Sequence, residues 1–109
     1  MSIKEELIDF MKSKRTNAWI GDNFIQVYVR KGIHSFGGDI IKTFDVANIE
    51  QDPIHIGKGY FKSFMIQVEE VGLPIYVENI HNPKLTEMLA KNGYLILTSL
   101  YSTHAIKNF

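Results

Sequence analysis

The stretch of sequence that decides the fold is residues 53–72, which read PIHIGKGYFKSFMIQVEEVG. Two glycines, Gly57 and Gly59, enclose Lys58 and mark a tight turn. After the turn, apolar residues recur at the spacing of one helical face up to Gly72: Phe61, Phe64, Met65, Val68 and Val71. The pattern predicts a strand, a glycine turn and a helix in immediate succession.

Upstream of this stretch lie two segments rich in β-forming residues, residues 24–29 and residues 40–49. Gly37 and Gly38 mark a turn between them, so the pattern predicts a long antiparallel hairpin. Gly32 interrupts the first arm, which predicts a bend or bulge at that point.

An amphipathic helix is predicted over residues 3–13. Ser2 and Glu5 have the spacing of a capping box, and the apolar residues after them fall on one helical stripe. The residues that follow indicate a loop: Thr16, Asn17, Gly21 and Asp22.

Downstream, the short apolar run of residues 73–77 is typical of a buried strand. Asn82-Pro83 opens a second helix that ends at Gly93, and residues 94–101 predict a final strand. The tail beyond that strand shows no clear pattern. A hairpin followed by alternating helices and strands predicts an α/β (α+β) fold with a single mixed sheet and helices packed on its faces.

The composition is that of an ordinary globular domain, with 109 residues of which 45% are hydrophobic and 22% charged. It predicts one domain over residues 1–109 with a single core. Twelve basic and twelve acidic side chains balance, so we expect no nucleic-acid partner. No apolar run has the length of a signal peptide core or a membrane span, which predicts a cytoplasmic protein with no membrane contact.

Metal and disulfide chemistry are not expected from the sequence. The chain has no cysteine. Its four histidines lie in separate predicted elements and show no metal-ligand spacing: His34, His55, His81 and His104. We therefore expect no metal site.

The glycine turn has two interpretations. A glycine turn between a strand and a helix directs backbone N–H groups outward at the positive end of the helix, which is the geometry that holds a phosphate. The amides of Gly57, Lys58, Gly59 and Tyr60 are the candidate donors, with the side chain of Lys62 nearby. Two glycines beside a helix start are also ordinary turn chemistry, so the motif alone leaves both interpretations open.

The order of features over residues 47–96 resembles the GNAT N-acetyltransferase superfamily. Ala47-Asn48-Ile49-Glu50 is similar to the strand that receives acetyl-CoA, and residues 53–60 are similar to the pyrophosphate loop. The helix and the strand that follow the loop match in order, and so do the features of the last core helix: Asn82, then Lys91-Asn92-Gly93-Tyr94.

The resemblance implies that acetyl-CoA lies between two strands that splay apart, residues 45–51 and residues 73–77. Unpaired strand backbone can hydrogen-bond an extended, amide-containing ligand arm as if it were another strand. The resemblance assigns the cofactor contacts to these residues: Ile49, Gln51, Ile56, Gly57, Lys58, Gly59, Tyr60 and Asn82.

The chain departs from the family pattern at three positions. Ile54 stands where the family carries glutamine or arginine, and Phe61 where a small residue is common. Leu89 stands where a tyrosine often acts as the general acid, so protonation of the thiolate needs another donor, with Tyr94 or His81 as candidates.

Glu50 is the candidate general base, because the resemblance places it at the end of the strand that points at the acetyl group. An exposed strand-end carboxylate without a role is an equally good interpretation. Glu78, on the facing strand, is a second candidate.

Two functions follow from these features. The first is an acetyl-CoA-dependent N-acetyltransferase that acts on a primary amine of a protein or a small molecule. The second is a non-catalytic GNAT-like binding module that contacts another protein, which the three departures favour. A strand at the sheet edge over residues 94–101 leaves unpaired backbone, which predicts a homodimer built partly on that strand or on the tail.

Overall fold

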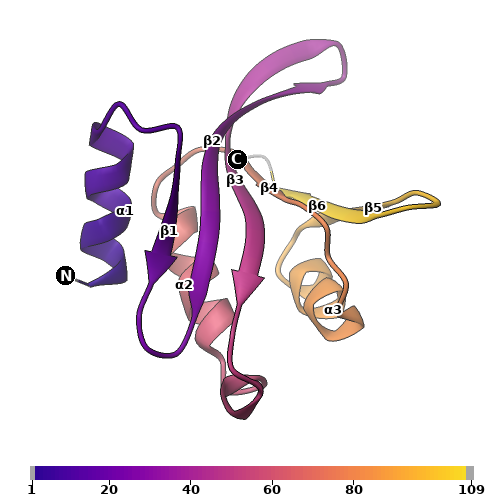
Figure 1. The fold of residues 1–109 in the computed structure, drawn as a ribbon. Helices are drawn as coiled ribbons and strands as arrows, with labels where there is room; N and C mark the ends of the chain where they lie inside the picture. Colours follow the sequence, from indigo (N-terminus) through magenta and orange to yellow (C-terminus); the bar gives the residue numbers. More distant parts are fainter. Residues whose placement is uncertain (1, 108–109) are drawn as a thin grey trace.

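The computed structural model describes residues 2–107. The described residues form three α-helices, a short 3-10 helix (η1) and six strands, and Figure 1 shows how the helices and the sheet are arranged. Their order is α1 (Ile3–Lys12), β1 (Asn17–Gly21), β2 (Gln26–Phe36), β3 (Asp39–Glu50), η1 (Pro53–His55), α2 (Tyr60–Glu69), β4 (Ile75–Val77), α3 (Pro83–Lys91), β5 (Leu95–Thr98) and β6 (Thr103–Lys107). No helix within the described residues is long and apolar enough to cross a membrane.

The six strands form one mixed sheet in the order β1-β2-β3-β4-β6-β5. Within this sheet β3 and β4 run parallel, and the other neighbours are antiparallel. The first half of the sheet is the predicted hairpin, β2 and β3, which turns at Gly37-Gly38. The predicted fold class, a mixed sheet with an N-terminal antiparallel hairpin and packed helices, is confirmed.

The two faces of β3 differ because successive strand residues point to opposite sides of a sheet. Phe44 and Val46 are fully buried in the core that α1 and α2 share. The ring of Phe10 in α1 meets Phe44 edge to face, with centroids 6.3 Å apart. Thr43 and Asp45 alternate with these residues on the other face, and both are buried although they are polar.

The predicted capping box opens α1. The Glu5 amide donates to Ser2 Oγ at 3.1 Å, and the Ser2 amide donates to Glu5 Oε1 at 3.3 Å. The loop predicted after this helix is wrong for Asn17 and Gly21, which are the ends of strand β1. All five residues of this strand pair with β2, and the pairing stabilises the strand. The local propensity of these residues therefore does not predict it.

Of the bend or bulge predicted at Gly32, the bulge is wrong. Gly32 pairs regularly with Thr43, and the register shifts instead at the step from Tyr28 to Val29, opposite Ala47 on β3. The glycine has a packing role, because a Cβ at residue 32 would lie 2.1 Å from Asp45 Oδ2. Its missing side chain leaves room for that carboxylate.

The C-terminal strand is also corrected. The predicted strand over residues 94–101 ends at Thr98, and the tail folds back as β6 (Thr103–Lys107) between β4 and β5. The sequence of the tail shows no clear pattern because this interior strand has only five residues, too few for a recognisable alternation of apolar and polar side chains. Residues 108–109 of the tail lie outside the described part of the chain.

Candidate functional site

The site begins where the two parallel strands separate. β3 and β4 pair over three residues each, ending at Val46 and Val77, and the last bond runs from the Glu78 amide to the Val46 carbonyl at 2.9 Å. Beyond this point β3 continues to Glu50, with the bulge opposite Tyr28, while the chain after β4 turns away. The strands therefore splay as the resemblance implies.

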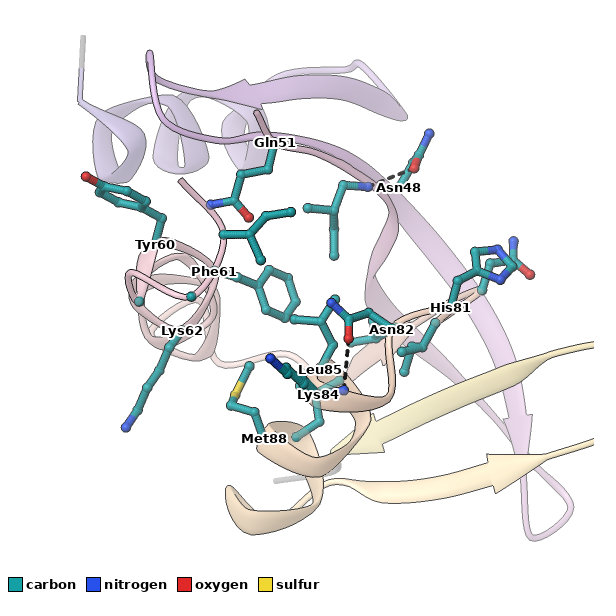
Figure 2. Close-up of a pocket in the computed structure, with 18 of the residues that line it drawn as sticks. Asn48, Gln51, Tyr60, Phe61, Lys62, His81, Asn82, Lys84, Leu85 and Met88 are labelled. Carbon is teal, nitrogen blue, oxygen red and sulfur yellow. Dashed lines mark hydrogen bonds between the residues drawn. The ribbon is translucent and has the colours of Figure 1, made fainter. Parts of the chain in front are cut away.

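A cavity of about 530 Å³ lies at this splay. Its walls come from the end of β3, the glycine turn, the start of α2, the chain after β4 and α3, as Figure 2 shows. Apolar side chains from β3, α2, β4 and α3 line its interior: Ile49, Phe61, Val77, Leu85 and Leu89. The cavity has the size and apolar lining of a small-molecule or cofactor site.

The glycine turn forms one wall of this cavity. Gly57 has φ 82° and Gly59 has φ 85°, conformations that disfavour any residue with a Cβ. Gly59 is the N-cap of α2 and provides no side-chain cap, so the first amides of that helix are left for another acceptor. Within the described residues, none of the amides of residues 57–62 donates to backbone.

Three aromatic rings pack against one another beside the glycine turn. Phe24, in the loop between β1 and β2, stacks on Tyr60 with centroids 4.7 Å apart and ring planes 6° from parallel. His55 meets both rings edge to face, at 5.1 Å and 5.7 Å. Gln51 Nε2 donates to the His55 carbonyl at 3.2 Å. These contacts tie the end of β3 and the β1–β2 loop to the start of α2.

Most of the cofactor contacts that the resemblance assigns lie on the cavity: Ile49, Gln51, Ile56, Gly57, Gly59, Tyr60 and Asn82. Lys58 is exposed and lies outside the lining, which instead includes Lys62. Asn82 caps α3, because its Oδ1 accepts from the Lys84 amide at 2.9 Å. The roles of these residues toward a cofactor stay predictions.

The backbone edge of β3 has an internal partner. The Ile49 amide donates to the side-chain Oδ1 of Asn48 at 2.8 Å. A ligand carbonyl that took this amide would have to replace the Asn48 side chain. The sequence predicts no role for Asn48, because a hydrogen bond to the following residue leaves no mark in the pattern.

The three residues that depart from the family pattern lie in different parts of the structure. Ile54 is 67% exposed on η1 and puts no charge near the turn. Phe61 is buried in the core and also lines the cavity. Leu89 is fully buried and lines the cavity from α3, so the position offers apolar surface in place of a proton donor.

The candidate acids and bases are spread over several places. Glu50 is exposed, pairs with Gln26 and does not line the cavity. Glu78 lines the cavity and forms an ion pair with Arg30. His81 lines the cavity and is exposed to solvent. The structure therefore does not bring Glu50 and Glu78 to one wall.

Tyr94 is a core residue and not a cavity residue. Its hydroxyl donates to Glu69 Oε1 at 3.1 Å, and its side chain is buried behind α3. Burial, together with the adjacent Glu69 carboxylate, raises the pKa of Tyr94 far above its ordinary value. The phenol therefore stays neutral and hydrogen-bonded to Glu69, so Tyr94 is a poor proton donor.

This raised pKa predicts a loss of stability at alkaline pH. A tyrosine in the unfolded chain ionises near a pKa of about 10, so the neutral bonded phenol stabilises the folded state below that pH and the contribution is lost as the pH rises above it. Thermal melts between about pH 8 and pH 11 should show a steeper fall in Tm for the parent than for Tyr94→Phe. Glu69 keeps Lys107 as a partner in that variant. Parallel curves for the two proteins would contradict the prediction.

Comparison with known proteins supports the fold. No family model and no curated protein sequence matches this chain. A mutant of the AtaT toxin, solved with the C-terminus of the antitoxin AtaR and acetyl-CoA, superposes with a TM-score of 0.62 at 13% identity, over 78% of this chain and 58% of that chain. The KacTA–DNA complex gives a TM-score of 0.62 at 16% identity, over 95% of this chain and 79% of that one.

Both superpositions fit the GNAT-like fold that the sequence predicts. The splayed strands, the glycine turn at the start of a helix and these superpositions define the class: the chain has the GNAT acetyltransferase fold, in a divergent form. It spans 58% of the length of the AtaT chain.

Proposed function

We propose that this chain binds acetyl-CoA in the cavity between β3 and β4 and transfers the acetyl group to a primary amine of a protein or a small molecule. The main support for the proposal is that the gap between β3 and β4 and the glycine turn open into the same cavity. A cavity of about 530 Å³ extends from the open edge of β3 to the amides at the start of α2. An extended ligand with a phosphate group at one end fits both features.

In this proposal the backbone amides of the glycine turn and of Tyr60 bind the pyrophosphate. Ile49 and Gln51 present the edge of β3 to the pantetheine arm, and the apolar walls exclude water from it. The amine nitrogen attacks the thioester carbonyl, the carbon–sulfur bond breaks, and the nitrogen loses a proton through water to Glu50, which lies outside the cavity lining. His81 is the proposed proton donor to the departing thiolate, because it lines the cavity.

The proposal is tested by calorimetric titration with acetyl-CoA and with CoA. We expect saturable binding of both at a stoichiometry of one per chain. Absence of binding would contradict the proposal and leave the fold serving another role. CoA release in the presence of an amine acceptor, measured with a thiol reagent, tests transfer separately from binding.

A second candidate function is a non-catalytic module that contacts another protein. It is favoured by Leu89 at the position of the usual acid and by an AtaT neighbour bound to the C-terminus of an antitoxin. The assay of CoA release with an amine acceptor distinguishes the two functions. Binding of acetyl-CoA without turnover on any protein, peptide or small amine would favour the module.

We also propose a homodimer built on β5. This strand is an edge of the sheet, and the hairpin it starts exposes large apolar side chains: Leu95, Leu97, Leu100 and Tyr101, the last two more than nine-tenths exposed. Unpaired strand edges with apolar side chains associate readily.

Light scattering should therefore give twice the chain mass for the parent protein and for Ile40→Lys, which changes an exposed apolar residue on the remote β2–β3 hairpin. Leu97→Lys, which puts a charge on the edge strand, should give the single-chain mass. A single-chain mass for the parent at high concentration would exclude the dimer.

A further inference from the structure

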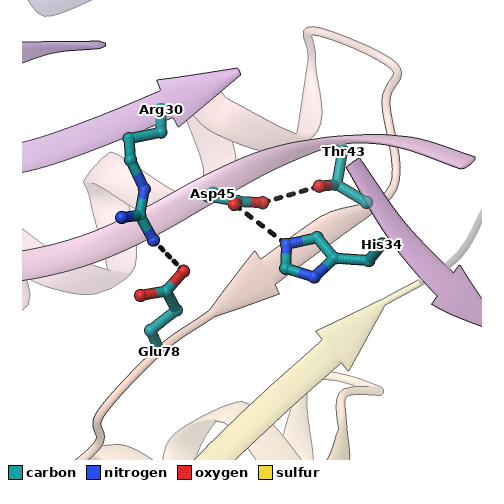
Figure 3. A network of polar contacts seen from close by, with 5 residues as sticks. All are labelled: Arg30, His34, Thr43, Asp45 and Glu78. Carbon is teal, nitrogen blue, oxygen red and sulfur yellow. Dashed lines mark hydrogen bonds and ion pairs between the residues drawn. The ribbon is translucent and has the colours of Figure 1, made fainter. Parts of the chain in front are cut away.

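A compact polar cluster lies on the sheet face opposite the α1–α2 core, as Figure 3 shows. It brings together His34 from β2, Asp45 from β3 and Glu78, which directly follows β4. One donor atom from each of the three side chains lies within 4.8 Å of the others. His34 Nε2 is 2.9 Å from Asp45 Oδ2. An imidazole and two carboxylates thus face one another across three adjacent strands.

Neighbouring polar side chains hold both carboxylates in place. Asp45 Oδ1 accepts from Thr43 Oγ1 at 2.6 Å, and Glu78 Oε1 pairs with the guanidinium of Arg30. The second oxygen of Asp45 is the one directed at His34. This is the arrangement of outer groups that orient carboxylate ligands around a metal ion.

The position of Asp45 is fixed by the fold. Asp45 is 3% exposed, and the missing Cβ of Gly32 on the neighbouring strand provides the space that the carboxylate fills. The ring of His34 stacks on Tyr76 with centroids 4.0 Å apart and planes 17° from parallel. The imidazole and the buried carboxylate are therefore preorganised, and binding a cation there would cost little side-chain ordering.

We propose that His34, Asp45 and Glu78 form a site for a divalent transition-metal ion, with Zn²⁺ as the best-matched ion. Imidazole nitrogen and carboxylate oxygen are both Zn²⁺ ligands, and an imidazole in the set favours Zn²⁺ over Mg²⁺. Three protein ligands leave a fourth position for water or substrate. Because Glu78 also lines the cavity, the ion lies at the boundary between the cavity and the outer sheet face.

The charge of the cluster is compatible with a cation. Asp45 and Glu78 carry two negative charges when ionised, and Arg30 offsets one of them. Arg30 engages one oxygen of Glu78, which leaves the carboxylate a second oxygen for a cation. Sequence spacing could not reveal this site, because His34 and Asp45 are 11 residues apart and Glu78 lies beyond another strand, β4.

The test is calorimetric titration of the untagged, chelator-treated protein with Zn²⁺ alone and with Mg²⁺ alone. We expect one Zn²⁺ per chain and at least about tenfold weaker binding of Mg²⁺. His34→Gln should abolish the stoichiometric site, whereas His104→Gln should retain it. His104 is the matched control, because its ring also lies against Tyr76, at 5.5 Å, and it is outside the ligand group.

Two further measurements separate a metal site from a structural polar network. Thr43→Val removes the hydroxyl that holds Asp45 and should weaken Zn²⁺ binding about tenfold to a hundredfold. In the parent protein, Zn²⁺ should shift the NMR signals of residues 34, 45 and 78, a readout that needs no variant.

The proposal is overturned if the parent binds no Zn²⁺, if it binds Mg²⁺ equally well, or if His34→Gln binds Zn²⁺ like the parent. Shifts that map only to other histidines would overturn it as well. None of these outcomes depends on acetyl-CoA binding, so the metal site and the proposed function can fail separately.

Discussion

Replacement of Gly59 by valine is expected to weaken acetyl-CoA binding by about tenfold to a hundredfold, since each charge-assisted hydrogen bond contributes about 1.5–3 kcal/mol. Gly59 has φ 85°, and a β-branched residue resists that conformation. The backbone would rotate away, and the amides at the start of α2 would no longer point together at the cavity. Calorimetry with acetyl-CoA measures the change.

The structure supplies a matched control for this experiment. Gly38 in the β2–β3 turn has φ 90°, and a Cβ at either glycine meets nothing within 4 Å. Gly38→Val and Gly59→Val should therefore lower Tm by similar amounts through backbone strain, while only Gly59→Val loses affinity. Equal affinities in the two folded variants would show that the glycine turn is structural only.

Replacement of Glu50 by glutamine is expected to lower the rate of acetyl transfer by about a hundredfold or more, because the attacking amine must lose its proton and a positioned base contributes at least that much. Glutamine keeps the shape of the side chain and removes the proton acceptor. Acetyl-CoA affinity should stay at the parent value. The assay follows CoA thiol release on whichever acceptor supports turnover.

Glu78→Gln is the comparison variant, since Glu78 lines the cavity and Glu50 does not. Loss of activity in Glu78→Gln with full activity in Glu50→Gln, both measured in chelator-treated protein so that the proposed metal site does not contribute, would transfer the base role to Glu78. Full activity in both variants would contradict a carboxylate base at either position. If the parent shows no turnover on proteins, peptides or small amines, the binding-module function replaces the enzyme function.

The errors in the sequence-based fold have a common physical cause. β1 and β6 were missed because they are short, and their pairing with β2 and with β4 and β5 stabilises them more than their own propensity does. The bulge was placed at Gly32 because glycine often marks one. There the glycine makes room for Asp45, a neighbour that only the sheet register reveals.

The sequence by itself determined the features that depend on neighbouring residues. These are the capping box at Ser2, the hairpin turn at Gly37-Gly38, the glycine turn before α2 and the cap of α3 at Asn82. Each follows from backbone conformation or helical periodicity, which a few consecutive residues fix. Together with the order of elements, they were sufficient to predict the fold class.

The tertiary structure alone decided which distant residues meet. It placed Glu50 off the cavity wall, and it joined His34, Asp45 and Glu78 into one cluster. Strand order and register set these contacts, and a shift of one residue in register would turn every side chain of a strand to the other face. Such pairings join segments that are far apart in the chain, so no local pattern in the sequence records them.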